Sequence, residues 1–231
     1  MHRVTSTFPR STPSLQNPKN VNLVDCNSLL EAGDSTAAAE QSDRVQIEYP
    51  KLLETLQTER AKRQWASADV SIALVSANEE SESQKRFTAM LVRSGFETDV
   101  SSYRDNYVSV PAGRRPSDFY DQEKRQRPLV SLSSRIAYAL GVLARWQDAQ
   151  VVVVSHAFEL HWPMRDFLQR NPRARIGLAY FGGLLDNRWK QAGLFDKESP
   201  IQFLELEDSG LFGGLELRRR TPPLPSGLSR L

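Results

Sequence analysis

Short apolar runs alternate with amphipathic segments over most of the chain. Residues 151–154 are four consecutive valines, a β-branched run typical of a strand covered on both faces. Residues 164–169 follow a helical pattern, with Pro163 at the position where proline opens a helix. Residues 175–181 are again apolar and precede a glycine pair. A strand, a helix and a strand in this order predict a right-handed crossover in a parallel sheet.

The same alternation continues on both sides of this unit. Segments 69–75, 96–100 and 201–206 have the length and composition of strands. Apolar positions recur at helical spacing in segments 49–65, 80–94 and 134–146. The order of these elements predicts an α/β fold with a mainly parallel, Rossmann-like sheet flanked by helices. In such sheets, ligands bind at the carboxyl ends of the strands.

The two ends of the chain lack this periodicity. Residues 1–45 are rich in Ser, Thr, Asn, Pro and Ala, and such a segment buries too little apolar surface to offset the entropy lost on ordering. Residues 208–231 are rich in Gly, Arg and Pro. We therefore predict flexible N- and C-terminal tails: a disordered arm over 1–45, one α/β domain over 46–207 and a disordered tail over 208–231.

The composition indicates in which compartment the protein resides and which kinds of partner it binds. The formal net charge of +2 makes no case for binding nucleic acid or membranes through overall charge. The single cysteine, Cys26, cannot form an internal disulfide and fits a reducing compartment. No apolar run approaches the about 18 residues of a membrane span. We predict a cytoplasmic protein with no membrane partner; the alternative is an organelle transit peptide over residues 1–20, which carry no acid.

A local basic cluster lies in the long polar segment 105–127. Its members are Arg114, Arg115, Lys124, Arg125 and Arg127, and Tyr103, Tyr107, Phe119 and Tyr120 are nearby in sequence. Basic side chains bind phosphates and aromatic rings stack on bases, so these residues are candidates for binding single-stranded nucleic acid. Acidic side chains at 118, 121 and 123 dilute the charge, and the alternative is an ordinary solvated loop.

Three carboxylates fall at predicted carboxyl ends of strands: Glu79, Glu159 and Asp186. Hard cations such as Mg²⁺ or Mn²⁺ take carboxylate oxygens as ligands, so these residues form a candidate metal site, with Asn78 and Ser155 assisting. The alternative is that all three are solvated loop carboxylates.

Two histidines flank Glu159 in the segment HAFELH. On a helix, His156 and His161 would lie about 140° apart and would not face one metal, which argues against zinc. His156 has two alternative roles, a general base beside Glu159 or a hydrogen-bonded structural residue. The turn SANEES after the strand 69–75 has no glycine, which argues against a dinucleotide or phosphate-binding loop.

Residues 69–208 resemble the NYN branch of the PIN-like ribonuclease fold. In that family the first strand ends in an acidic residue followed closely by Asn, and a middle helix begins with Asp. The third core strand ends in a Ser-Gly-Asp-Ser-Asp-Phe turn. In VSANEE, Ser76 stands at the first acid and Asn78 at the Asn, and Ser131 stands at the helix Asp.

The third turn of this chain is SHAFELHWP. Ser155 matches the family, Ala157 replaces the first Asp, Glu159 stands for the second and Leu160 for the Phe. The resemblance implies a site where acids hold Mg²⁺ or Mn²⁺ and the metal activates water to cut RNA. Because most of these acids are replaced here, it implies an RNA-binding domain with lost or weakened nuclease activity.

Two functions are therefore predicted. The first is an NYN/PIN-like RNA-binding domain that uses the basic cluster and a groove at the strand ends. The groove residues are Ser76, Asn78, Ser131, Ser155 and His156. The second is a non-enzymatic domain that recruits a protein through the helix 49–65 and the tails, where residues 219–225 fit the Arg-x-x-Pro-x-x-Pro spacing of a polyproline ligand. A metal-dependent hydrolase is a third candidate, and the sequence leaves enzymatic activity open.

Overall fold

A seven-stranded sheet forms the centre of the computed structural model, which describes residues 18–39, 46–77, 81–104, 127–128, 131–181, 184–191, 199–206 and 211–213. The strand order is β5-β4-β3-β1-β6-β7-β8. Six strands are parallel, and only β5 runs antiparallel to its neighbour. The strands are β1 (Asn20–Asp25), β3 (Val70–Ala77), β4 (Glu97–Arg104), β5 (Arg127–Pro128), β6 (Gln150–Val154), β7 (Arg175–Phe181) and β8 (Ile201–Leu206). The predicted α/β class is confirmed.

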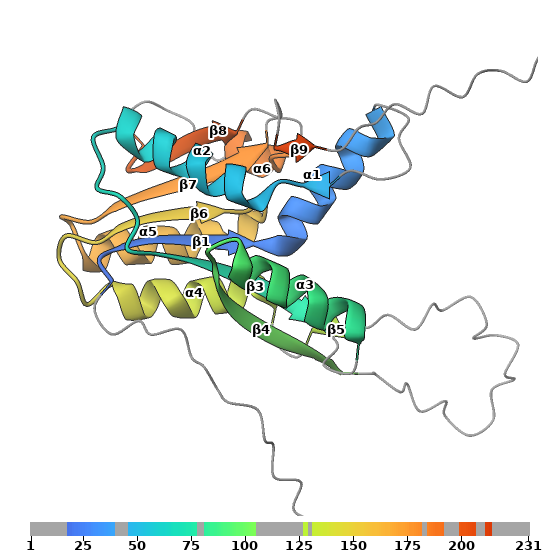
Figure 1. The fold of residues 1–231 in the computed structure, drawn as a ribbon. Helices are drawn as coiled ribbons and strands as arrows, with labels where there is room; N and C mark the ends of the chain where they lie inside the picture. The colour runs from blue at the N-terminus through green and yellow to red at the C-terminus, as the bar shows by residue number, and fades with distance from the viewer. Residues whose placement is uncertain are drawn as a thin grey trace, which may run out of the picture.

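Helices cover both faces of this sheet (Figure 1). One face packs against α1 (Cys26–Ala39), α2 (Tyr49–Lys62) and α3 (Glu82–Arg93). The other packs against α4 (Leu132–Leu143), the 3₁₀ turn η2 (Phe158–Leu160), α5 (His161–Arg170) and α6 (Asn187–Gln191). Each helix contributes a buried apolar stripe, and alternate strand residues fill the two cores between the layers. None of these helices is long and apolar enough to cross a membrane.

The first strand lies at the middle of the sheet, with β3 on one side and β6 on the other. The prediction of a disordered arm over 1–45 is therefore wrong for residues 18–39, and the domain begins before residue 46. The sequence signal is weak because Asn22 interrupts the apolar run. In the fold, Asn22 is buried and satisfied: its amide nitrogen donates to Ser71 Oγ at 2.9 Å, and its carbonyl accepts from Arg60 Nη1 at 2.9 Å.

The carboxyl boundary also lies further along the chain than predicted. A second, two-stranded sheet pairs β2 (Gln46–Ile47) with β9 (Phe212–Gly213) in antiparallel register. The Glu48 amide donates to the Leu211 carbonyl at 2.8 Å, and Leu211 is buried. The domain therefore includes residues 211–213, which the sequence assigned to the tail. Residues 1–17 and 214–231 of the predicted tails lie outside the described residues.

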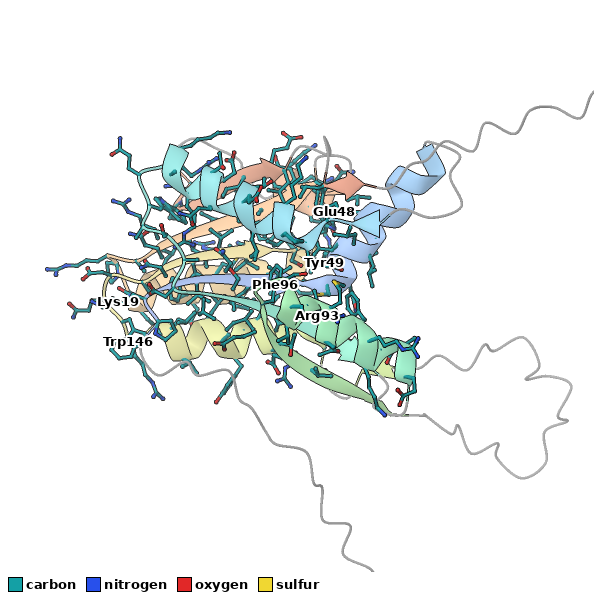
Figure 2. All side chains as sticks on the ribbon, viewed as in Figure 1. Lys19, Glu48, Tyr49, Arg93, Phe96 and Trp146 are labelled. Atoms are coloured by element: carbon teal, nitrogen blue, oxygen red, sulfur yellow. The ribbon has the colours of Figure 1, made fainter. Side chains whose placement is uncertain are left out.

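Helix α2 docks on its own chain. Tyr49, Leu52 and Leu56 are buried in the core, and the Tyr49 ring packs edge-on against Phe96 with centroids 6.1 Å apart (Figure 2). The apolar face of this helix is thus already covered by the sheet. The protein-interaction hypothesis then depends on the tails alone.

Gly177 in β7 sits where another strand and an indole approach closely. A Cβ at this position would lie 2.5 Å from Leu204 Cδ1 and 3.4 Å from the Trp65 ring. Both neighbours are buried and cannot move aside freely. We expect Gly177→Ala to lower the free energy of unfolding by about 1 to 3 kcal/mol through overpacking, measured by urea denaturation.

The matched control is Gly141→Ala in α4. A Cβ at Gly141 meets nothing within 4 Å, and alanine in an exposed helix is more stable than glycine by about 0.5 to 1 kcal/mol. The two glycine-to-alanine changes should therefore have opposite signs. A neutral or stabilising Gly177→Ala would contradict the packing around β7.

Candidate functional site

The topology places a ligand-binding position between β1 and β6. The helices that follow β1 cover one face of the sheet, and the helix that follows β6 covers the other. Successive strands are therefore added toward β4 on the β1 side and toward β8 on the β6 side, although β1 and β6 are parallel. The crevice at the carboxyl ends of these two strands is the topological switch point, where α/β proteins bind ligands.

Four short polar side chains line this edge on the face covered by α4. Leu23, Leu74 and Val153 belong to the core under α4, and two residues further along their strands come Asp25, Ser76 and Ser155 on the same face. Ser101 is the strand partner of Ser76. We call these four buried residues, Asp25, Ser76, Ser101 and Ser155, the polar row.

Helix α4 begins near the polar row. Residues 144–149 join its end directly to the amino end of β6, so α4 runs back along the sheet and starts at the carboxyl edge. Figure 2 shows Trp146, which follows α4, and Lys19, which precedes β1, at the opposite, amino edge, where the Gln150 amide donates to the Lys19 carbonyl at 2.8 Å. The hydroxyl of Ser131 caps the helix by accepting from the Ser134 amide at 3.1 Å.

Asp25 is the centre of a hydrogen-bond cluster across the switch point. Its Oδ2 accepts from the hydroxyls of Ser28 and Ser155, each at 3.0 Å. Its Oδ1 accepts from the amides of Asn27 at 3.0 Å and Ser28 at 3.3 Å, which caps the start of α1. The carboxylate therefore ties α1 to the end of β6.

His156 extends this cluster toward β7. Its amide donates to Ser28 Oγ at 3.2 Å, and its Nε2 accepts from the Phe181 amide at 3.4 Å. The Nδ1 atom is buried and has no hydrogen-bond partner within the described part of the chain. Burial lowers the pKa of His156 below its usual range, and the nearby Asp25 carboxylate opposes this effect. The contacts match the structural role predicted as an alternative.

The lowered pKa of His156 predicts a loss of stability at acidic pH. In the unfolded chain the pKa of this histidine is about 6.5, whereas in the folded state its pKa is lower and it resists protonation. As the pH falls below this value the unfolded state binds more protons, so the free energy of unfolding decreases. We expect a lower urea midpoint at pH 5.5 than at pH 7.5.

His156→Gln is the control for this pH effect. Glutamine keeps an acceptor for the Phe181 amide and does not titrate. In the variant, the difference in free energy of unfolding between pH 7.5 and pH 5.5 should be smaller than in the wild type. The difference that remains includes the contribution of His161, whose pKa is also lowered by burial. An unchanged difference would show that His156 does not contribute.

Two hydroxyls of the polar row are unpaired. Ser76 Oγ and Ser101 Oγ are buried and find no hydrogen-bond partner among the residues that the structure describes. A buried hydroxyl without a partner costs free energy, so this edge retains hydrogen-bonding capacity that a bound ligand could use.

Two of the predicted metal-binding carboxylates do come together, but around a guanidinium. Arg188 Nη2 lies 2.6 Å from Asp186 Oδ2 and 3.6 Å from Glu159 Oε1, and its guanidinium carbon lies 4.8 Å from the centre of the Phe158 ring. The Arg188 hydrogen bonds lower the pKa of Asp186. These two carboxylates already have a cationic partner.

The residues present do not form a Mg²⁺ or Mn²⁺ site in the described ranges. No group of three or more His, Cys, Asp or Glu side chains there could hold a metal ion, and both oxygens of Asp25 are occupied by hydrogen bonds. Glu79 lies outside these ranges. Its convergence with Glu159 and Asp186 stays a prediction.

Some of the other predicted site residues lie at the carboxyl edge of the sheet, and others lie outside the described residues. Ser76 and Ser155 lie in the polar row, and Ser131 caps α4 at the same edge. Arg127 lies in β5, where only its backbone is described. The predicted residues outside the described ranges are Asn78, Glu79, Arg114, Arg115, Lys124 and Arg125.

Sequence reasoning missed Asp25, Asn27 and Ser28. They follow the strand that was assigned to the disordered arm. The available signal was the run Val21 to Val24 ending directly in an acid, because an Asp after apolar residues is typical of a helix cap at a strand end.

Comparisons with protein-family models, with curated proteins and with solved structures found no match to this chain.

Proposed function

We propose that this chain is an NYN/PIN-like RNA-binding domain whose metal-dependent ribonuclease activity is lost or weakened. The observation that carries the proposal is Asp25 at the end of the central strand, hydrogen-bonded at 3.0 Å to Ser155 across the switch point. The resemblance implies a carboxylate at the end of the first strand and a serine at the start of the Ser-Gly-Asp-Ser-Asp-Phe turn, which are the positions of Asp25 and Ser155.

The resemblance also becomes better aligned once β1 is taken as the first strand. The family pattern of an acid followed closely by Asn falls on Asp25 and Asn27, which directly follow apolar residues. Ser76 and Asn78, which the sequence placed in these roles, follow the second parallel strand instead. Ser155 and Glu159 keep their assigned positions in the turn after β6, which is then the fourth parallel strand along the chain. This alignment supports the family proposal on one more acidic residue than the original one.

Loss of nuclease activity is supported by the chemistry of the side chains at the edge. A cleaving site needs several carboxylates around the cation. Here Ser131 stands at the helix position, Ala157 replaces one Asp, and Glu159 is paired with Arg188. Asp25 is left as the acid of the polar row.

RNA binding is supported by the attachment of the basic segment to the same edge. Residues 105–126 connect the carboxyl end of β4 to β5, and Arg104 and Arg127 are strand partners. The basic residues at 114, 115, 124 and 125 therefore belong, in sequence, to the connection between these two strand ends. Positive side chains and unpaired hydroxyls both suit phosphate and ribose groups. The proposal also keeps the predicted cytoplasmic location.

The test uses the full chain and a fluorescein-labelled single-stranded 20-nucleotide RNA. We expect anisotropy to report binding that weakens steeply between 50 and 200 mM salt, and we expect the RNA to stay intact in Mn²⁺. Arg114→Gln with Arg115→Gln should weaken binding more than the control pair Lys51→Gln with Arg93→Gln, which are exposed on α2 and α3.

Two results would contradict this function. Absence of binding at 50 mM salt would remove the RNA-binding proposal. Rapid RNA cleavage in Mn²⁺ that Asp25→Asn abolishes would show that the nuclease activity is retained.

A further inference from the structure

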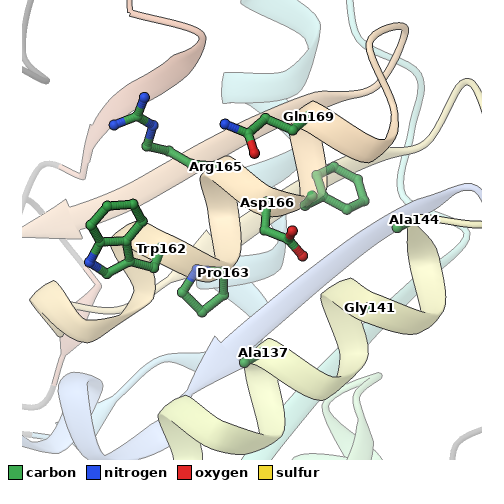
Figure 3. Close-up of a pocket in the computed structure, with 9 residues that line it drawn as sticks. Ala137, Gly141, Ala144, Trp162, Pro163, Arg165, Asp166 and Gln169 are labelled. Atoms are coloured by element: carbon green, nitrogen blue, oxygen red, sulfur yellow. The ribbon is translucent and has the colours of Figure 1, made fainter.

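A groove runs between α4 and α5 on the outer surface, away from the polar row. Its volume is about 400 Å³, within the range of ligand sites. Ala137, Gly141 and Ala144 form its α4 side, and no larger side chain of α4 lines it. Figure 3 shows Trp162 at the start of α5 and the Asp166 carboxylate directed toward α4.

Two aromatic side chains on the two helices that form this groove are exposed. Trp162, in the groove wall, is 70% exposed, and Tyr138, which follows Ala137 on α4, is 75% exposed. They are the most exposed large hydrophobic side chains among the described residues. Exposed aromatic rings lose favourable burial unless a partner covers them, so this pair marks an interaction surface.

The segment that contains both helices of the groove has more arginines than acids, and the groove lining itself has one charge of each sign, Arg165 and Asp166. Between Ser131 and Arg175 the chain has six arginines and three acidic residues, although the whole chain is nearly neutral. Asp166 pairs with Arg170, Glu159 with Arg188, and Arg135 with Asp99, so Arg165 is the cation of the groove lining. The Arg165 guanidinium carbon lies 5.9 Å from the centre of the Trp162 ring, so a cation accompanies the exposed indole.

We propose that the α4–α5 groove is a second contact surface for single-stranded RNA, with one base stacked on Trp162, a neighbouring phosphate on Arg165 and a further base on Tyr138. Aromatic platforms combined with basic side chains are what single-stranded nucleic acid requires. The arginine-rich tail at 218–225 suits the groove less, because its charge has the same sign as the net charge of residues 131–175. This inference rests on the proposed RNA-binding function and extends it to the outer surface of the α4–α5 layer.

The experiment measures anisotropy with the same labelled RNA and the full chain. Trp162→Ala should weaken binding by about 10-fold or more, since stacking on an aromatic ring contributes strongly per base, whereas Trp162→Phe should stay close to wild type. Arg165→Gln should reduce the salt slope by about 0.7 for the lost phosphate contact. Val92→Ala is the control, because Val92 is exposed on α3 at the other face.

Tryptophan fluorescence gives an independent signal. Trp65 and Trp189 are buried and Trp146 is half-buried, so Trp162 is the indole that iodide reaches most easily. Bound RNA should protect it from iodide quenching, and Trp162→Phe should remove the protected component.

The outcomes separate this inference from the general function. If wild type binds RNA and the Arg114/Arg115 variant weakens binding but Trp162→Ala does not, the groove proposal is overturned and the RNA-binding function stands. If the wild type binds no RNA, both the RNA-binding function and the groove proposal are overturned. If a synthetic peptide of residues 218–227 protects Trp162 and RNA does not, the groove binds the polyproline tail and the RNA surface is overturned.

Discussion

Arg60→Met should unfold at a markedly lower urea concentration than the wild type, with a loss of about 3 to 5 kcal/mol. Arg60 is fully buried between α2 and the sheet. Its guanidinium donates to Ala66 O at 2.7 Å, Asn22 Oδ1 at 2.9 Å and Gln150 O at 3.1 Å. Methionine fills similar space but donates nothing, so these three oxygens, and Val21 O at 3.4 Å, lose a donor at once.

The charge of Arg60 is unusual because these partners are neutral. Burial lowers its pKa to about 10, and Asp69 partly opposes this shift. The side chain is therefore still protonated at neutral pH, and its stabilising role comes from its fixed fork of donors. Arg60→Lys, with a single ammonium, should recover only part of the loss.

Arg93→Met is the matched control for this change. Arg93 is exposed at the end of α3, and its replacement should change the free energy of unfolding by less than about 0.5 kcal/mol. A stability of Arg60→Met equal to that of the control would show that the buried hydrogen bonds contribute no net stability.

Asp25→Ala should be the second large loss, about 2 to 4 kcal/mol, because it removes a helix cap and two hydroxyl contacts together. The amides of Asn27 and Ser28 and the hydroxyls of Ser28 and Ser155 all donate to this carboxylate. Differential scanning calorimetry and urea denaturation would measure the loss. The end of β6 should lose amide protection first, since Asp25 ties it to α1.

Asp148→Ala controls for the loss of one negative charge. Asp148 is exposed in the turn before β6, and its removal should be nearly neutral. Asp25→Asn keeps one acceptor oxygen, so its free energy of unfolding should lie between those of Asp25→Ala and Asp148→Ala. If Asp25→Ala is as stable as Asp148→Ala, the cluster is held by its other contacts and Asp25 does not organise the switch point.

The sequence was sufficient to predict a strand where the strand is apolar throughout. The valines of β6 and the apolar residues of β7 predicted two core strands, and the crossover between them is present. Ser76 and Ser155 were also predicted to lie at strand carboxyl ends, and the structure has both at the carboxyl edge of the sheet. These predictions depend only on local pattern and chain order.

The first strand could not be found in this way because its partners lie far along the chain. Asn22 is acceptable in the core only through Ser71 and Arg60, and neither partner is visible from local pattern. The same applies to Glu159: its position after a strand suggested a metal, whereas Arg188 reaches it only in the folded chain. Long-range partners of polar groups are the information that periodicity lacks.

The central position of β1 also affects how the protein forms during synthesis. Val21 pairs with Val70 on one side and with Val151 on the other, so the second partner leaves the ribosome about 130 residues after the first strand. At typical elongation rates this takes roughly 6 to 26 s. During that time the β1 edge of the nascent sheet stays open to other chains, which makes this protein a candidate for chaperone protection until β6 is complete.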